Sequence, residues 1–129
     1  MGLKYLWDTN AVIYYLQKYF SDNDQELMNN IINSYQPAIS VITEIELLCW
    51  KTTNAQDLNL LSSFISDCVV LQLDQYVKLN TINIRKGYNI KLPDAIIAAT
   101  ALTADLTLIS NDKKGFNKVP SLELFTPLI

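Results

Sequence analysis

Four carboxylates occupy positions from which an α/β fold could assemble a metal-dependent hydrolytic site. Asp8 ends an apolar run in LWDTN, Glu46 lies in ITEIELL, Asp94 opens LPDAIIAATAL and Asp112 follows a strand-like run in LISNDKKGF. The chain has no His, so hydrolysis would have to depend on oxygen ligands and metal-bound water. Such ligands suit Mg²⁺ or Mn²⁺, and two ions roughly 3.5–4 Å apart could activate water against a phosphodiester.

Most of these acids also have a purely structural interpretation. Asp8 could be the N-cap of a helix, with Asn10 sharing that work. Thr43 and Glu46 have the spacing of a capping box, and Asp112 in its turn-like SND could be a further cap. Taken together these interpretations become strained, because several carboxylates at one sheet edge repel one another unless cations neutralise them.

Asp94 carries more information than the other acids. Pro93 before it suits the first helical position, and an acid in the first turn complements the helix dipole. However, Asp94, Ile97, Ala98 and Ala101 are spaced i, i+3, i+4, i+7, so the acid heads the stripe that packs on the sheet. We therefore expect its carboxylate to be aimed along the edge of the sheet.

Glu44 is a rival to Glu46 for the second acidic position. Two helical residues in this relation point about 200° apart around the helix axis. One of the two can therefore face the sheet edge, and helix geometry alone leaves open which one does.

The elements that would position these acids alternate along the chain. Apolar runs predict strands at residues 3–7, 38–41, 68–73, 106–110 and 122–125, and helical spacing predicts helices at residues 10–20, 22–35, 43–51, 57–65, 75–86 and 93–104. This alternation predicts one α/β domain over residues 1–129, a three-layer α/β/α sandwich around a mainly parallel sheet of about five strands. Ligands of such sheets bind beyond the carboxyl ends of the strands, where strand order reverses.

The charge of the chain is compatible with a nucleic-acid substrate once the four acids are set apart. The net charge is −3, but four of the 13 acids belong to the motifs, which leaves nine acids against ten bases elsewhere. Basic residues flank two of the motif acids and are candidate phosphate contacts: Arg85, Lys86 and Lys91 before Asp94, and Lys113, Lys114 and Lys118 after Asp112.

The remaining composition favours an intracellular protein. Cys49 and Cys68 lie in apolar, helix-like segments, and we expect buried thiols instead of a disulfide. The N-terminal residues lack a secretory apolar region, and the uncharged run at 95–104 is shorter than the roughly 18 residues of a membrane span. We expect a soluble, cytoplasmic protein.

Two other uses of a similar sheet fit less well. An aspartyl-phosphate phosphatase needs a second acid two residues after the first, where this chain has Asn10. A response-regulator receiver would use an acid such as Asp74 after its third strand, but the acid pair expected beside the first strand is missing.

The four motifs together resemble the PIN-domain family, and within it the VapC-type toxin ribonucleases of bacterial toxin–antitoxin modules. LWDTN resembles the opening Asp-Thr/Ser-Asn motif of the family, and ISVITEIELL its second-strand-to-helix motif, with the family acid at Glu46. LPDAIIAATAL is similar to the Asp-headed helix of small residues, and LTLISNDKKGF to the closing strand and Asn-Asp turn. The resemblance covers essentially the whole chain.

The resemblance implies a Mg²⁺- or Mn²⁺-dependent endoribonuclease, a homodimer held inactive by a VapB-like antitoxin. It implies that Asp8, Glu46 and Asp94 are metal ligands, with Asp112 a ligand directly or through water. The orienting polar groups would be Asn10, Ser110 and Asn111.

The same resemblance leaves the inhibitory surface and one alternative function to consider. We expect the antitoxin to lay a C-terminal segment over apolar helix surface and to deliver Arg or Lys near Asp8 and Asp94. The candidate surface is Val12, Tyr15, Leu16 and Tyr19, which could equally be core. The alternative is a non-catalytic PIN-like module that binds RNA or protein, although such a module would normally have lost one of the four acids.

Overall fold

A computed structural model describes residues 2–129, which fold around a five-stranded sheet in the order β3-β2-β1-β4-β5. All four strand pairings are parallel. The strands are β1 (Tyr5–Trp7), β2 (Ala38–Ser40), β3 (Val69–Leu71), β4 (Thr107–Ile109) and β5 (Leu124–Phe125). The predicted parallel sheet of five strands is confirmed.

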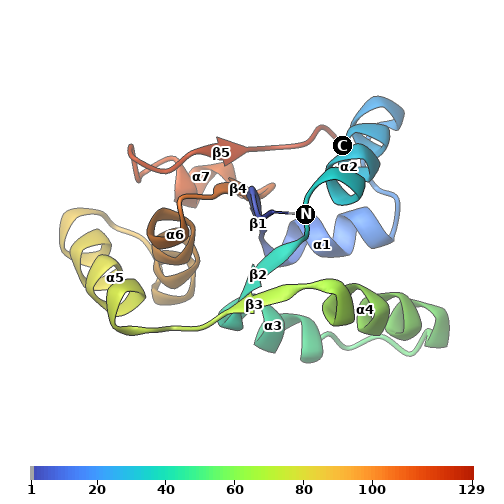
Figure 1. Ribbon diagram of the computed structural model, residues 1–129, viewed down its shortest axis with the longest axis horizontal. Helices are drawn as coiled ribbons and strands as arrows, with labels where there is room; N and C mark the ends of the chain where they lie inside the picture. Colours follow the sequence, from blue (N-terminus) through green and yellow to red (C-terminus); the bar gives the residue numbers. More distant parts are fainter. Residues whose placement is uncertain (1) are drawn as a thin grey trace.

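Helices cover both faces of the sheet, as the sandwich prediction requires (Figure 1). One face packs against α5 (Gln75–Gly87), α6 (Leu92–Ala104) and α7 (Lys113–Phe116), and the other against α1 (Thr9–Leu16), α2 (Asp22–Ser34) and α4 (Ala55–Asp67). The short helix α3 (Val41–Leu48) continues directly from the carboxyl end of β2.

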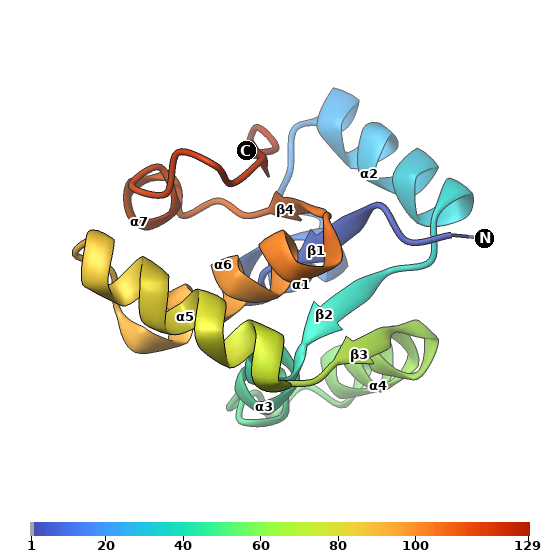
Figure 2. The same ribbon diagram turned by 60° about the vertical axis from the view of Figure 1, so that its left-hand side comes forward.

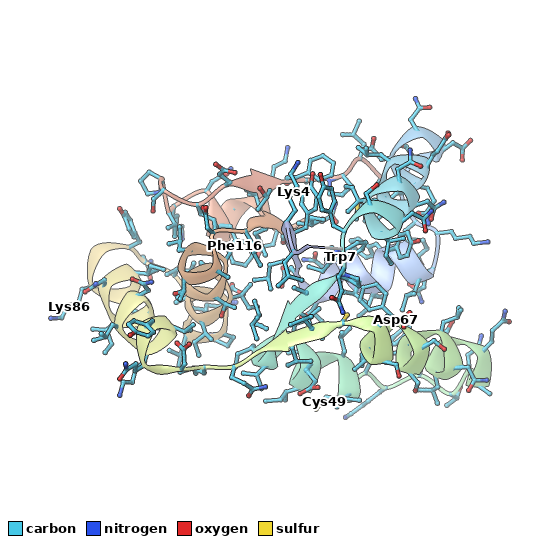
Figure 3. All side chains as sticks on the ribbon, viewed as in Figure 1. Lys4, Trp7, Cys49, Asp67, Lys86 and Phe116 are labelled. Atoms are coloured by element: carbon cyan, nitrogen blue, oxygen red, sulfur yellow. The ribbon has the colours of Figure 1, made fainter. Side chains whose placement is uncertain are left out.

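The three central strands β1, β2 and β4 are short but mostly buried, and consecutive strand residues point to opposite faces of the sheet. Leu6 enters the core beneath α5 and α6, and its neighbour Trp7 enters the core beneath α1 and α4. Leu108 and Ile109 of β4 divide between the two cores in the same way. Figure 3 shows Trp7 and Phe116 in the interior, on opposite sides of β1.

Helix α6 is apolar around most of its circumference because it lies between the sheet and α5. Four of its alanines, Ala95, Ala98, Ala99 and Ala101, are fully buried. Small side chains let the helix approach both neighbours closely. The stripe that the sequence predicted behind Asp94 is therefore part of the core, and it fixes the direction of the first turn of α6.

The order of the strands reverses at β1. The chain runs from β1 outward through β2 to β3, and then returns past β1 to form β4 and β5 on its other side. The connections that leave β1 and β4 diverge, which opens a crevice beyond their carboxyl ends. Asp8 and Ser110 are the first residues beyond these two ends.

The first helix is shorter than predicted. It ends at Leu16, and Lys18 adopts a left-handed backbone conformation with φ 58. The turn reverses the chain and brings Phe20, 5% exposed, into the core. The apolar spacing of the sequence predicted a helix that reaches residue 20. Phe20 is indeed buried, but it enters the core from the chain that follows the helix.

The expectation of two buried thiols is wrong for Cys49. This residue is exposed where α3 ends, whereas Cys68 is half-buried. Both thiols are free, and burial raises the pKa of Cys68 to about 12. Within residues 2–129, no helix is both long enough and apolar enough to cross a membrane.

Candidate active site

Asp8 lies at the carboxyl end of β1 and is fixed against the end of β4. Trp7 pairs with Ile109 across the two parallel strands, so Asp8 and Ser110 are neighbours. The Asp8 amide donates to the Ile109 carbonyl at 2.9 Å, and the Ser110 hydroxyl donates to Asp8 Oδ2 at 2.7 Å. The Thr9 amide donates to Asp8 Oδ1 at 2.9 Å. The chain therefore holds both carboxylate oxygens in place.

The Asp8 carboxyl is 6% exposed. Burial raises its pKa from 3.8 to about 6, hydrogen bonds from Ser110 and Thr9 lower it, and the carboxylates of Asp94 and Glu46 raise it. Helix capping does not account for this burial. The Asp8 side chain accepts from the first residue of α1, whereas a typical cap accepts from the second or third. If capping were the only role of this position, an uncharged residue could cap the helix without the cost of burying a charge.

Glu46 is directed to Asp8 by a threonine hydroxyl. Thr9 Oγ1 donates to Glu46 Oε1 at 2.6 Å and lies 3.3 Å from Thr43 Oγ1. The predicted capping box does not form, because Ser40 is the N-cap of α3 and its hydroxyl accepts from the Thr43 amide. Glu46 raises the pKa of both Asp8 and Asp94, whereas Glu44 is not among the causes for either. The structure therefore brings Glu46, not Glu44, to the other acids.

Asp94 lies in the first turn of α6, half-buried and near enough to Asp8 and Glu46 to interact with them electrostatically. Burial raises its pKa, the carboxylates of Asp112 and Glu46 raise it further, and Lys91 lowers it. The N-cap of α6 is Lys91, which makes no side-chain capping bond. The Asp94 carboxylate therefore interacts electrostatically with both Asp112 and Glu46.

Asp112 is positioned by the short helix α7, which the sequence had not predicted. As N-cap, it accepts from the Gly115 amide at 3.4 Å, while its own amide donates to Ser110 Oγ at 3.0 Å. A Cβ atom added to Gly115 would lie 3.5 Å from Asp112 Oδ2 and 3.7 Å from Asp94 Oδ2. The two carboxylates therefore flank Gly115. Asp112 caps a helix, as one interpretation predicted, and also lies beside a second candidate acid of the site.

The three predicted orienting groups behave differently. Ser110 bridges the Asp8 carboxylate and the Asp112 amide. Asn10 Oδ1 accepts from the Asn111 amide at 3.1 Å and so joins α1 to the end of β4. The Asn111 side chain points elsewhere, because its Nδ2 donates to the Pro127 carbonyl at 2.9 Å. Asn111 therefore contributes backbone to the site but no orienting side chain.

The basic residues extend from the site on one side. Lys91, Lys114 and Lys118 line a hollow together with Asp94 and Asp112. Arg85 and Lys86 line an adjoining hollow farther from the acids. Lys113 is exposed on α7 and lines neither hollow, although its place in the sequence made it as good a candidate phosphate contact as Lys114.

Residues 5–122 match the PIN domain family, and this span includes all four acidic motifs. The chain belongs to the PIN domain family. The family resemblance predicted from the motifs is therefore confirmed.

This PIN domain is similar over nearly its whole length to VapC proteins. It is 28% identical over 130 residues to the tRNA(fMet)-specific endonuclease VapC of Salmonella typhimurium, covering 95% of this chain and 96% of that protein. Its fold matches DNA-bound VapBC from Salmonella typhimurium with a TM-score of 0.79 and 26% identity, covering 96% and 98% of the two chains. A DNA-bound VapBC2 from Rickettsia felis gives the same TM-score and coverage at 24% identity.

The acids of this PIN domain fit a divalent cation by their chemistry. Their mutual effects on pKa link Asp112, Asp94, Glu46 and Asp8, and oxygen-only ligands of this kind suit a hard cation. As the side chains stand, no three His, Cys, Asp or Glu side chains within residues 2–129 converge as ligands of one ion. Mg²⁺ usually keeps several of its waters, and such waters can bridge the ion to carboxylates that do not all reach it directly. A partly hydrated ion is therefore compatible with these donors.

Thr9 is the residue of the site that sequence reasoning missed. Its amide contacts Asp8 and its hydroxyl contacts Glu46, so one side chain connects the first two acids. The signal was present in LWDTN, where a hydroxyl residue directly follows the acid. The position of its partner 37 residues later became visible from the tertiary structure.

Proposed function

We propose that this PIN domain is a Mg²⁺- or Mn²⁺-dependent endoribonuclease and the toxin of a VapBC-type pair. The observation that carries the proposal is the buried Asp8 carboxylate, held beside other acids at the reversal of strand order. Burying such a charge costs stability and is common where function requires it. The similarity to the tRNA(fMet)-specific endonuclease VapC supports hydrolysis of RNA as the reaction.

Asp8, Glu46 and Asp94 would hold the cation, with Asp112 holding it directly or through water. When bound, a divalent cation supplies Lewis acidity to phosphate oxygens and makes water a stronger acid. The Ser110 hydroxyl fixes the orientation of the Asp8 carboxylate through its hydrogen bond to Oδ2.

Other side chains would position the acids and the substrate. The Thr9 hydroxyl holds Glu46 beside Asp8. Lys91 and Lys114 line the hollow next to Asp94, where they could bind the phosphates that flank the scissile bond.

Cleavage of labelled single-stranded RNA by the purified protein tests this function. Activity should require Mg²⁺ or Mn²⁺, disappear with a chelator, and fall at least 100-fold in Asp94→Asn. The matched control is Asp105→Asn at the other end of α6, where a left-handed backbone (φ 55) suits Asn. Chelator-resistant cleavage, or equal cleavage by both variants, would contradict the mechanism.

A non-catalytic PIN-like module remains the alternative function. That module would bind RNA or a protein without cleaving RNA under any metal condition.

We further propose that an antitoxin inhibits the site through the groove between α1, α2 and α4. This groove of about 820 Å³ is lined by Tyr15 and Leu16 of α1 and by Tyr19 in the turn that follows, with Asn29 of α2 and Leu60 of α4. Val12 is fully buried, so for this residue the alternative of a core position holds and it is not part of the surface. The solved relatives from Salmonella typhimurium and Rickettsia felis are VapBC complexes, which supports a VapB-like partner for this chain.

A homodimer and a cytoplasmic location belong to the same proposal. Ile45 and Leu48 on α3 are 53% and 68% exposed, and exposed apolar side chains on one helix are typical of an interface. Sedimentation equilibrium at micromolar concentration measures the oligomeric state. A monomer there would remove the dimer from the proposal without affecting the nuclease mechanism.

A further inference from the structure

A basic trench leads from the acidic site to the C-terminal end of α5. Its inner hollow, about 360 Å³, contains Asp94 and Asp112, and its outer hollow, about 550 Å³, contains Lys86 and Tyr88. The two hollows share residues 89–91 in their walls and therefore adjoin. Figure 2 shows the connection between α5 and α6 lying beside α7. Each hollow falls within the roughly 300–1,000 Å³ range of ligand clefts.

The trench concentrates positive charge in a protein that is acidic overall. It is lined by five of the ten Lys and Arg residues of the chain, although the net charge is −3. The five are Arg85, Lys86, Lys91, Lys114 and Lys118. Among residues 2–129, the acids that line it are Asp94 and Asp112 of the candidate active site. Such separation creates a field that attracts an anion along the trench toward those two acids.

Two of the five cations have structural roles. Lys118 Nζ donates to the Asn89 carbonyl at 2.8 Å, and an Arg85 guanidinium nitrogen donates to the Ile90 carbonyl at 3.2 Å. These bonds hold in place the backbone of residues 89 and 90, which line both hollows. Lys86, Lys91 and Lys114 remain exposed, and Figure 3 shows Lys86 projecting from the outer end of α5.

Tyr88 places an aromatic ring among these cations. It is the C-cap of α5 and is 39% exposed along the outer hollow. Cations in the last turn of α5 stabilise that helix end, which explains Arg85 and Lys86. Helix stabilisation does not explain Lys91, Lys114 or the exposed ring. A cationic groove with an aromatic platform is the arrangement that binds single-stranded nucleic acid.

We propose that the basic trench binds one side of a single-stranded RNA substrate and guides it into the acidic site. Lys86, Lys91 and Lys114 contact backbone phosphates. Tyr88 stacks on a base in the outer hollow, next to the inner hollow that contains Asp94. A duplex keeps its base faces stacked on one another, and an acidic peptide has no base to stack on Tyr88. This inference rests on the proposed nuclease function for the direction of the strand.

Fluorescence anisotropy with labelled single-stranded RNA tests the trench, in an Asp94→Asn background so that cleavage does not interfere. Tyr88→Ala should weaken binding about tenfold, and Tyr88→Phe should restore it, because stacking needs the ring. The double variant Lys86→Gln/Lys114→Gln should weaken binding at low salt. It should also reduce the slope of log affinity against log salt by about 1.4, since each phosphate contact on a single strand contributes about 0.7.

The matched controls lie on the same helix but outside the trench. Tyr76→Ala and Lys78→Gln remove an exposed ring and an exposed cation near the start of α5, and they should leave binding unchanged. Equal losses in the trench and control variants would overturn the proposal, as would equal binding of duplex RNA. Tighter binding of a poly-glutamate peptide than of RNA would overturn the choice of ligand.

The cleavage assay separates this inference from the proposed function. If the trench variants weaken RNA binding as expected but the parent chain cleaves no RNA with Mg²⁺ or Mn²⁺, the nuclease function fails and the trench stands. If the parent cleaves RNA but the trench variants bind like the controls, the trench fails alone.

Discussion

Replacing Asp8 with Asn should stabilise the metal-free protein at neutral pH, and the gain should vanish in acid. The carboxylate is 6% exposed and its pKa is raised from 3.8 to about 6, first of all by burial. A folded-state pKa above the unfolded value means that the folded protein binds this proton more tightly. Ionised Asp8 therefore opposes folding at pH 7, and protonation relieves that cost.

The magnitude follows from the two pKa values. The difference between 3.8 and about 6 corresponds to roughly 3 kcal/mol of lost stability above pH 6. The cost declines as pH falls through 6 and is absent below about pH 4. Asn retains an acceptor for the Thr9 amide but faces the Ser110 hydroxyl with an amide, which costs about 1 kcal/mol at every pH. The net gain at pH 7 should be about 2 kcal/mol.

Urea unfolding of both proteins in the presence of a chelator, at pH 4, 5, 6 and 7, measures the effect. The stability of Asp8→Asn minus that of the parent should increase by about 2.4 kcal/mol between pH 4 and pH 7, because the unfolded carboxyl is already partly ionised at pH 4. The hydrogen-bond cost of the substitution is the same at every pH, so it does not contribute to this change with pH. Asp105→Asn, an exposed acid at the C-cap of α6, is the control and should show no comparable change.

Two outcomes would refute the reasoning. A pH-independent difference would mean that the Asp8 carboxyl is not desolvated in the folded protein. A parent that gained stability relative to Asp8→Asn as pH rose would reverse the sign of the argument. Saturating Mg²⁺ should reduce the difference at pH 7, because a cation that binds the folded state offsets the buried charge.

The remaining predictions concern the other acids and the partner. Mg²⁺ or Mn²⁺ should raise the melting temperature of the parent by several degrees but that of Asp94→Asn much less, and an equal rise in differential scanning fluorimetry would count against a site built around Asp94. Glu46→Gln should reduce RNA cleavage at least tenfold more than Glu44→Gln, because Glu46 faces Asp8 through Thr9; the opposite ranking would place the wrong acid in the site. An antitoxin tail that delivers Arg or Lys to these acids should compete with metal, so its affinity measured by calorimetry should fall as Mg²⁺ is titrated. Unchanged affinity in Mg²⁺, or in Asp94→Asn, would show that inhibition acts elsewhere.

Local periodicity carried enough information to predict the fold. Strands β1, β2 and β4 were predicted from short apolar runs because each is buried on both faces, and an apolar run is the sequence pattern of such a strand. The Asp94 helix was predicted from its small-residue stripe, which the structure buries completely. Asp8 and Asp112 were identifiable because each directly follows a strand-like run, and parallel strands end at the same edge.

The details of the site depended on contacts between residues far apart in the chain. The family resemblance favoured Glu46 over Glu44, and the structural reason is a hydroxyl 37 residues away on Thr9. Ser110 fixes Asp8 across 102 residues. The Asn111 side chain donates to the Pro127 carbonyl instead of facing the acids. No local sequence pattern indicates which of these two directions the side chain takes.

Surface placement was also decided by the tertiary structure. Lys113 and Lys114 are adjacent and chemically identical, yet Lys114 alone of the two lines the trench beside Asp112. The pattern of apolar residues placed Val12 and Tyr19 on the same candidate surface, but Val12 is fully buried and Tyr19 is 57% exposed. The sequence by itself determined which residues are apolar or charged and how they repeat, because those properties are local. The fold decided which charges share a hollow and which apolar groups are covered, because both depend on how distant elements pack.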